Sequence, residues 1–175
     1  AGQSYLRLKH SMTYLNRLKY VILILNAEND ILDVRANHRY NKSKPMFGLK
    51  NGKLYLKHQA LSRYSLRNLF SKSIVLRKLC ELHPKVKEGF AVLAGDHEVS
   101  EEEAKQILKR LILEIRDLAG KNGAAFYILN SPSMLDFSDD PIDFLWAEKI
   151  IEKHGLKTID IFTPIRKKLK DPQVL

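Results

Sequence analysis

The sequence predicts an α/β fold with a parallel sheet covered by helices on both faces, a three-layer α/β/α arrangement. Two short runs, Val21–Leu25 and Ala124–Leu129, are continuously apolar, which is typical of strands buried on both faces of a sheet. Segments with helical spacing separate these runs from each other and from a third strand at Thr158–Phe162. Strands that alternate with helices indicate a parallel sheet with right-handed crossover connections.

The first half of the chain holds two expected helices, a strand and a hairpin. A helix from Gln3 to about Asn16 is expected because apolar residues recur along it at helical spacing, and the strand Val21–Leu25 follows it. Farther on, Lys44–Lys57 carries Asn51-Gly52 between two apolar runs, which predicts a β-hairpin with a type I′ turn. Leu66–Leu82 is expected to be helical.

The second half begins with the clearest helix, Ser100 to Leu118, whose apolar residues repeat at intervals of three and four. Ser100 and Glu103 have the spacing of a capping box, and Gly120 and Gly123 can adopt the left-handed conformation that ends a helix. Residues 83–98, just before it, are expected to form an irregular loop.

The strand Ala124–Leu129 follows that helix. Beyond it, Ile142–His154 is expected to form a helix that Gly155 ends, and Thr163 is expected to cap a last helix after the third strand. At 175 residues, the chain has the size of a single domain.

Positive charge is concentrated in one segment. Residues 35–90 contain 14 Lys and Arg but only Glu81 and Glu88 as acidic residues, so this segment carries +12 in a chain of net charge +10. Such a segment indicates either a solvated face or a surface that binds a polyanion or an anionic lipid surface. It holds no recognisable RNA-binding motif, zinc-finger spacing or helix-turn-helix, so a nucleic-acid partner is not expected.

Other kinds of site are not expected from the sequence. No apolar run approaches the about 20 residues of a membrane helix. The six His and the single Cys80 lack the spacing of metal ligands, so neither a metal nor another cofactor is expected. Gly95–Glu98, which lies just before the Ser100 helix, is read as part of the start of that helix rather than as a catalytic or metal cluster.

Polar side chains crowd the end of the first strand, where Asn26, Glu28, Asn29, Asp30 and Asp33 lie within a few residues of one another. Open α/β sheets bind their ligands beside the carboxyl ends of their strands. We therefore expect this polar segment to be a loop that lines a ligand site. In it, Asp30 would bond loop N–H groups and orient Asn29, and Asp33 would be solvated; a carboxylate pair of Asp30 and Asp33 is the alternative.

This stretch, "VILILNAENDILD" (Val21–Asp33), resembles the third conserved block of the SGNH, or GDSL-type, hydrolases, which reads Gly-x-Asn-Asp at the end of a buried strand. The hairpin "YNKSKPMFGLKNGKLYL" resembles an excursion that one branch of the family inserts after this block. "LAGKNGAAFYILNSPS", and the strand Thr158–Phe162 followed by "TPIRKKL", resemble later units of the family. The resemblance therefore spans nearly the whole chain.

The resemblance implies an incomplete flavodoxin-like SGNH hydrolase domain over residues 1–175, into which residues 36–98 are inserted as a basic cap. It implies that the Asn29 side chain donates to the oxyanion of an ester's tetrahedral intermediate, with Asp30 in an orienting role. Ala27 stands where the family has Gly.

The family's other catalytic blocks are not found in the sequence. The chain contains no Gly-Asp-Ser, and none of its ten Asp residues is followed three places on by His. Gly2-Gln3-Ser4 is not taken as the nucleophile block, because its middle residue differs and it opens a helix. We therefore expect an internal part of a serine esterase, beginning after the second block and ending before the last, that does not hydrolyse esters by itself.

Three interpretations of function remain open. The intact protein is expected to act on a small ester, for example an acetylated glycan, by hydrolysis or acyl transfer. Ala27 favours an inactive member of the family as an alternative, and residues 35–90 favour a non-catalytic domain that binds a polyanion or an anionic surface. The resemblance implies export or membrane tethering through a segment outside this chain. The oligomeric state stays open, although an incomplete sheet predicts self-association.

Overall fold

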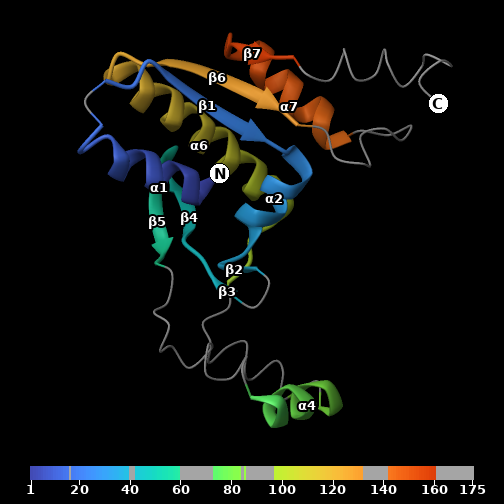
Figure 1. Ribbon diagram of the computed structural model, residues 1–175. Coiled ribbons are helices and arrows are strands. Elements are labelled where there is room, and N and C mark those ends of the chain that lie inside the picture. The colour runs from blue at the N-terminus through green and yellow to red at the C-terminus, as the bar shows by residue number, and fades with distance from the viewer. Residues whose placement is uncertain are drawn as a thin grey trace, which may run out of the picture.

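The computed structural model describes residues 1–15, 17–39, 42–59, 73–83, 85, 97–131 and 142–160. These residues form a mixed α/β fold (Figure 1). Strands β1 (Tyr20–Leu25), β6 (Ala125–Asn130) and β7 (Thr158–Ile159) make a three-stranded parallel sheet in the order β1-β6-β7. The predicted α/β fold with a parallel sheet is therefore confirmed.

Four helices accompany the sheet: α1 (Gly2–Ser11), α2 (Ala27–Arg35), α6 (Glu101–Lys121) and α7 (Ile142–Lys153). The predicted first helix ends at Ser11, several residues earlier than expected. Gly155, with φ of 55°, follows α7 as the sequence predicts. Helix α7 begins at Ile142 as predicted and ends one residue before the predicted end at His154. The helix expected from Thr163 lies outside the described residues. None of the described helices combines the length and the apolar character of a membrane span.

Helix α2 occupies the residues that the sequence analysis assigns to a polar loop, so that prediction is wrong. The Asn26 side-chain oxygen accepts the Asn29 backbone N–H at 3.0 Å, and the Asp30 carboxylate accepts the Asn26 N–H at 3.1 Å. The first of these bonds satisfies a donor that the start of a helix leaves unpaired, and the second ties the capping residue to the first turn. The polar cluster after β1 is therefore a helix cap.

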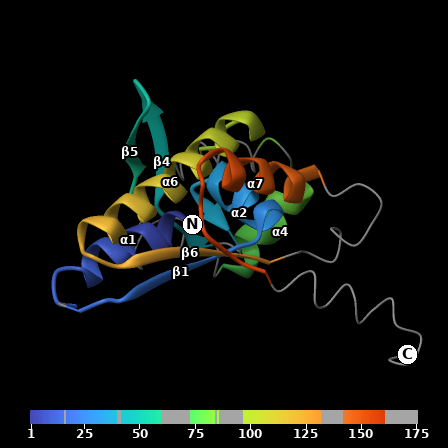
Figure 2. The ribbon, with the colours of Figure 1, turned by 90° about the horizontal axis from the view of Figure 1, so that it is seen from above.

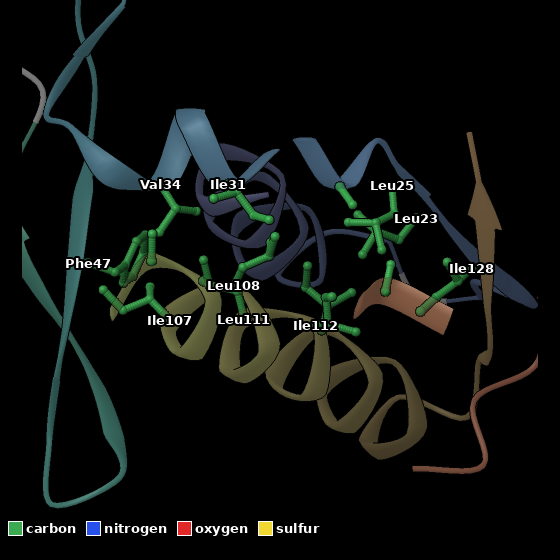
Figure 3. Close-up of a cluster of buried hydrophobic side chains, with 14 of the residues drawn as sticks. Leu23, Leu25, Ile31, Val34, Phe47, Ile107, Leu108, Leu111, Ile112 and Ile128 are labelled. Atoms are coloured by element: carbon green, nitrogen blue, oxygen red, sulfur yellow. The ribbon is translucent and has the colours of Figure 1, made fainter. Parts of the chain in front are cut away.

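Helix α6 carries the hydrophobic core, with its apolar stripe turned toward α2 and the sheet (Figure 3). One of the two bonds of the predicted capping box is present at its N-terminus, where Ser100 Oγ accepts the Glu103 N–H at 3.2 Å. Gly123, with φ of 73°, follows its C-terminus, whereas Gly120 lies inside the helix and does not end it. The buried residues of α6 are Ala104, Ile107, Leu108, Leu111, Ile112, Leu113, Ile115 and Ala119.

Helices α1, α2, α6 and α7 cover one face of the sheet. Helices α2, α6 and α7 contribute buried residues to the core cluster that contains Leu23, Leu25 and Ile128, and α1 packs partly buried residues against it. Figure 2 shows these four helices grouped on the same side of β1 and β6. On the opposite face of β1, Ile22 and Ile24 are 53% and 65% exposed.

For the described residues, the expectation of a sheet covered on both faces is therefore wrong: they form two layers rather than three, and β1 lies at the edge of their sheet. The physical reason is that an unbroken apolar run fits an edge strand with one bare face as well as a strand buried on both faces.

The predicted hairpin is present as β4 (Met46–Lys50) and β5 (Lys53–His58), which pair antiparallel. Asn51 and Gly52 have φ of 51° and 70°, as a type I′ turn requires. The hairpin reaches the core through Met46 and Phe47, which are 1% and 5% exposed. Two shorter strands, β2 (His38–Arg39) and β3 (Lys42–Ser43), pair with each other just before it.

The chain leaves the α/β body after α2 and returns to it before α6 through a short backbone stem. Ala36 and Glu98 form an antiparallel bridge. On either side of it, the Asn37 N–H donates to the His97 carbonyl at 3.2 Å, and the Val99 N–H donates to the Arg35 carbonyl at 2.8 Å. Along the sequence, the residues between the two sides of the stem include α4 (Ile74–Leu82), which is the described part of the helix predicted over residues 66–82. Most of the irregular loop expected over residues 83–98 lies outside the described residues.

Two neighbouring residues of β1 test whether only one face of this strand is covered. Leu25→Ala removes a side chain with no exposed area and is expected to lower the unfolding free energy by about 2–5 kcal/mol. Ile24→Thr alters a side chain that is 65% exposed and is expected to change it by no more than about 0.5 kcal/mol. Urea unfolding of both variants checks this difference, and comparable losses would show that the second face is covered as well.

Candidate functional site

A cleft of about 490 Å3 opens beside the carboxyl end of β1. The start of α1 and the first turns of α2 form two of its walls, and the segment that leads into the hairpin forms a third. Helix α1 runs antiparallel to β1, the strand that follows it in the sequence. The N-terminus of α1 therefore lies at the carboxyl end of β1, where α2 begins. The polar side chains that line the cleft include those of Ser4, Asn29, Asp30, Asp33, Arg39 and Lys44.

Asn29 lies in the first turn of α2, and one guanidinium group holds it there. Arg39 Nη2 donates to the Asn29 side-chain oxygen, and Arg39 Nη1 donates to the Asn29 backbone carbonyl at 3.0 Å. Residue Asn29 is exposed and lines the cleft. An amide has one acceptor oxygen and two N–H donors, so with the oxygen engaged by Arg39 the donors are turned away from the guanidinium.

Asp33 lies one turn farther along α2 and binds two cations. Its Oδ1 accepts from Arg39 Nη1 at 2.6 Å and lies 3.7 Å from Lys44 Nζ. Lys44 is 8% exposed, and this burial lowers the pKa of its ammonium group, an effect that the nearby Asp33 carboxylate partly opposes. The expectation that Asp33 is simply solvated is therefore wrong, because it is the counter-charge for both Arg39 and Lys44.

Asp30 has different partners from Asp33. Its carboxylate accepts the Asn26 backbone N–H at 3.1 Å and lies 2.8 Å from the backbone nitrogen of Ala1. The interaction described for the Asn29 side chain is with Arg39 rather than with Asp30. Asp30 can therefore orient Asn29 only indirectly: it binds Asn26, and Asn26 caps the Asn29 backbone N–H. This role of Asp30 stays a prediction.

The structure also brings Gly2, Gln3 and Ser4 to this cleft. Among the described residues no side chain caps α1, so the N–H groups of its first turn offer backbone donors at this end of the cleft. A Cβ at position 2 would lie 3.2 Å from the Phe47 ring, so close packing by itself favours glycine there. A single glycine at the start of a helix does not indicate, from the sequence alone, that Phe47 packs beside it.

The carboxyl end of β6 does not line this cleft. The Ser131 N–H donates to the Leu25 carbonyl at 2.7 Å and so extends the pairing of β6 with β1, and Ser131 is not among the described residues that line the cleft. Next to it, the Asn130 side-chain oxygen is buried and has no hydrogen-bond partner among the residues that the structure describes.

Two histidines meet beside the stem of the excursion. The His58 and His97 rings stack with centroids 4.0 Å apart and planes 21° apart, and Glu98 forms an ion pair with Arg35 at 3.0 Å. Partial burial lowers the pKa of His58, and the neighbouring His97 and Lys57 lower it further. Within the described ranges, no three His, Cys, Asp or Glu side chains gather closely enough to hold a metal ion.

Comparison with known proteins adds no family to these observations, because no protein-family model, no curated protein and no solved structure matches this chain. The assignment of a function to the cleft therefore rests on the geometry of its side chains.

Acidification is expected to destabilise the fold through His58. Its pKa in the folded state lies below the ordinary value of 6.5, so the unfolded chain binds more protons once the pH falls through 6.5. The stability that neutral His58 contributes to the fold is thus fully present above pH 6.5 and is lost as the pH falls below that value. Urea unfolding at roughly pH 7.5 and 5.5 should show a larger loss for the parent than for His58→Gln, which cannot titrate. Equal losses would contradict the expectation.

Proposed function

We propose that this chain is part of a serine ester hydrolase of the SGNH, or GDSL, type and that Asn29 is an oxyanion donor of its active site. The observation that carries the proposal is the position of the Asn29 amide in a cleft at the carboxyl end of a parallel strand, with its oxygen bound by Arg39. A donor that is already aimed where negative charge develops lowers the barrier to ester cleavage without reorganisation during the reaction.

The proposal requires a nucleophile close to Asn29. The outer edge of β1 is not paired among the described strands. A further parallel strand at that edge would lie about 4.8 Å away and would bring its own carboxyl end beside the start of α2. A serine at the end of such a strand, activated by a histidine, would complete the constellation. We expect residues outside the described ranges to supply these groups, as the flavodoxin-like order of the family implies.

The substrate that we propose is a small ester such as a carbohydrate O-acetyl ester, cleaved by hydrolysis or by acyl transfer. Arg39 and Lys44, which line the cleft, come from the excursion that the resemblance identifies as a cap. In this proposal the segment 36–98 both covers the active site and shapes it. Export or membrane tethering of the intact protein belongs to the same proposal.

The function is tested with p-nitrophenyl acetate and the intact protein that contains this chain. Asn29→Ala is expected to lower kcat by a factor of about 100–1,000, because it removes a donor to the oxyanion. Asn29→Asp keeps the shape of the side chain and an acceptor for Arg39, and it should lose comparable activity because it has no N–H group. The 175-residue chain alone is expected to be inactive.

Asn122→Ala is the matched control, since it removes an exposed amide that bonds the Leu118 carbonyl at the far end of α6. It should keep the parent's kcat. Full activity of both Asn29 variants, well above the uncatalysed rate, would refute the role of Asn29. An intact parent that hydrolyses no ester would refute the proposed enzyme.

A second candidate function is the binding of a polyanion or an anionic surface without catalysis. On β5, Lys53, Tyr55 and Lys57 alternate along the strand, so their side chains share one face, and all three residues are exposed. Two ammonium groups that flank an aromatic ring can bind anionic groups and pack against a sugar or lipid headgroup. This face belongs to the basic segment of residues 35–90.

Salt dependence tests this second function. Retention of the protein on heparin should fall steeply between roughly 50 and 300 mM NaCl if counterion release drives binding. Lys53→Gln/Lys57→Gln should elute at lower salt than Lys149→Gln/Lys153→Gln, which removes two exposed lysines from α7 and has the same net charge. Identical elution of the two variants, or retention that does not change with salt, would exclude the β5 face as the binding surface.

A further inference from the structure

We infer that Arg39 is a positioning residue for the proposed reaction: it sets the orientation of the Asn29 side chain so that the N–H2 group, and not the oxygen, faces the cleft. This inference rests on the proposed function, because it concerns the donor to the oxyanion. It gives the excursion a positioning role in the active site, in addition to the role of a cap that the resemblance implies.

The two ends of an amide group are alike in shape but opposite in hydrogen bonding. The oxygen and the N–H2 group of Asn are nearly the same size, and rotation about the terminal bond exchanges them at little cost. A hydrogen-bond donor in the cleft therefore becomes an acceptor when the group turns over. An oxygen facing a developing oxyanion would repel it, so a site of this kind needs a neighbour that permits only one orientation.

A guanidinium group is such a neighbour, because it carries N–H donors and no acceptor. Arg39 Nη2 donates to the Asn29 side-chain oxygen, and turning the amide over would bring two donor groups into contact. Arg39 Nη1 donates to the Asn29 backbone carbonyl at 3.0 Å as well, so both ends of this residue are bound by the same planar group. The amide orientation is therefore coupled to the position of helix α2.

The guanidinium is itself held in place. Asp33 accepts from Arg39 Nη1 at 2.6 Å and lies one helical turn beyond Asn29, so Arg39 spans two successive turns of α2. Arg39 belongs to β2, which pairs with β3 in the register Arg39↔Lys42. The stem between residues 35–37 and 97–99 fixes the start of this segment.

Lysine should not replace Arg39 in this role. A single ammonium is a compact point charge and cannot present two parallel N–H groups to the side chain and the backbone of Asn29 at once. Lys44 illustrates the difference: the ion pair that its ammonium forms within the described part of the chain is with Asp33, at 3.7 Å.

The test is a double-mutant cycle in the intact protein, with p-nitrophenyl acetate as substrate. Arg39→Ala is expected to lower kcat about 10-fold with little change in KM, because it weakens an interaction made in the transition state. Arg39→Lys should lose about as much. In an Asn29→Ala background, Arg39→Ala should cause no further loss, because the group that it positions is gone. Arg35→Ala is the control, since it removes an arginine whose ion-pair partner is Glu98 at the stem, and it should keep the parent's kcat.

The inference is overturned if Arg39→Ala retains the parent's kcat, or if it lowers kcat by the same factor with and without Asn29. Loss of activity through unfolding is recognised from the thermal melt of each variant. A variant that is unfolded is replaced by Arg39→Met, which keeps much of the side-chain volume but has no N–H donor, and the same loss of kcat is expected.

A second measurement does not depend on activity. The side-chain amide signal of Asn29 in the 15N-labelled 175-residue chain is identified by its disappearance in Asn29→Ala. Arg39→Ala should shift this signal, because the hydrogen bond to the amide oxygen is lost, and Arg35→Ala should not. An unchanged signal in Arg39→Ala would overturn the inference whatever the enzyme assays give. A shifted signal together with an intact parent that cleaves no ester would refute the proposed function but leave the contact standing.

Discussion

The burial of the apolar stripe of α6 is the interaction on which the rest of the structure depends. This helix packs against α1, α2 and β6 and also against the hairpin strands, so the α/β body and the excursion share one core. Leu108 and Leu111 have no exposed area, and each residue of this kind contributes a few kcal/mol of stability. Val34 of α2 and Phe47 of the hairpin both pack against α6 (Figure 3). The walls of the cleft that α2 and the hairpin segment form are therefore fixed relative to each other.

The cleft illustrates how a site can be assembled from short-range and long-range contacts. The Asn26 and Asp30 side chains place the first turn of α2 through local bonds, and these bonds need nothing outside the helix start. Arg39 then adds contacts to α2 from a different strand, and Asp33 balances the positive charge of Arg39 and of Lys44. The position of Asn29 thus depends on the α/β body, whereas the direction of its amide depends on the excursion.

Periodicity and turn chemistry allowed much of the fold to be predicted, but less of the site. The parallel strands, the hairpin at Asn51-Gly52 and the long helix from Ser100 each have a strong local signal. Helix α2 was missed because Asn and Asp are favoured both in helix caps and in loops, so composition does not separate the two. The contact of Arg39 with Asn29 and that of Gly2 with Phe47 join segments whose approach no local pattern encodes. The bare face of β1 was missed because a hydrophobic run does not reveal what covers it.

The stem at residues 35–37 and 97–99 has a consequence for how such a chain can vary. Its paired backbone keeps the two ends of the excursion within hydrogen-bonding distance. The entropic cost of closing a flexible loop grows slowly, by about 0.6 kcal/mol for each doubling of its length. A change in the length of the chain between the two sides of the stem therefore adds little to the entropic cost of closing it. The residues next to the stem, Arg39 among them, lack this tolerance of change, and selection on activity would act on them first.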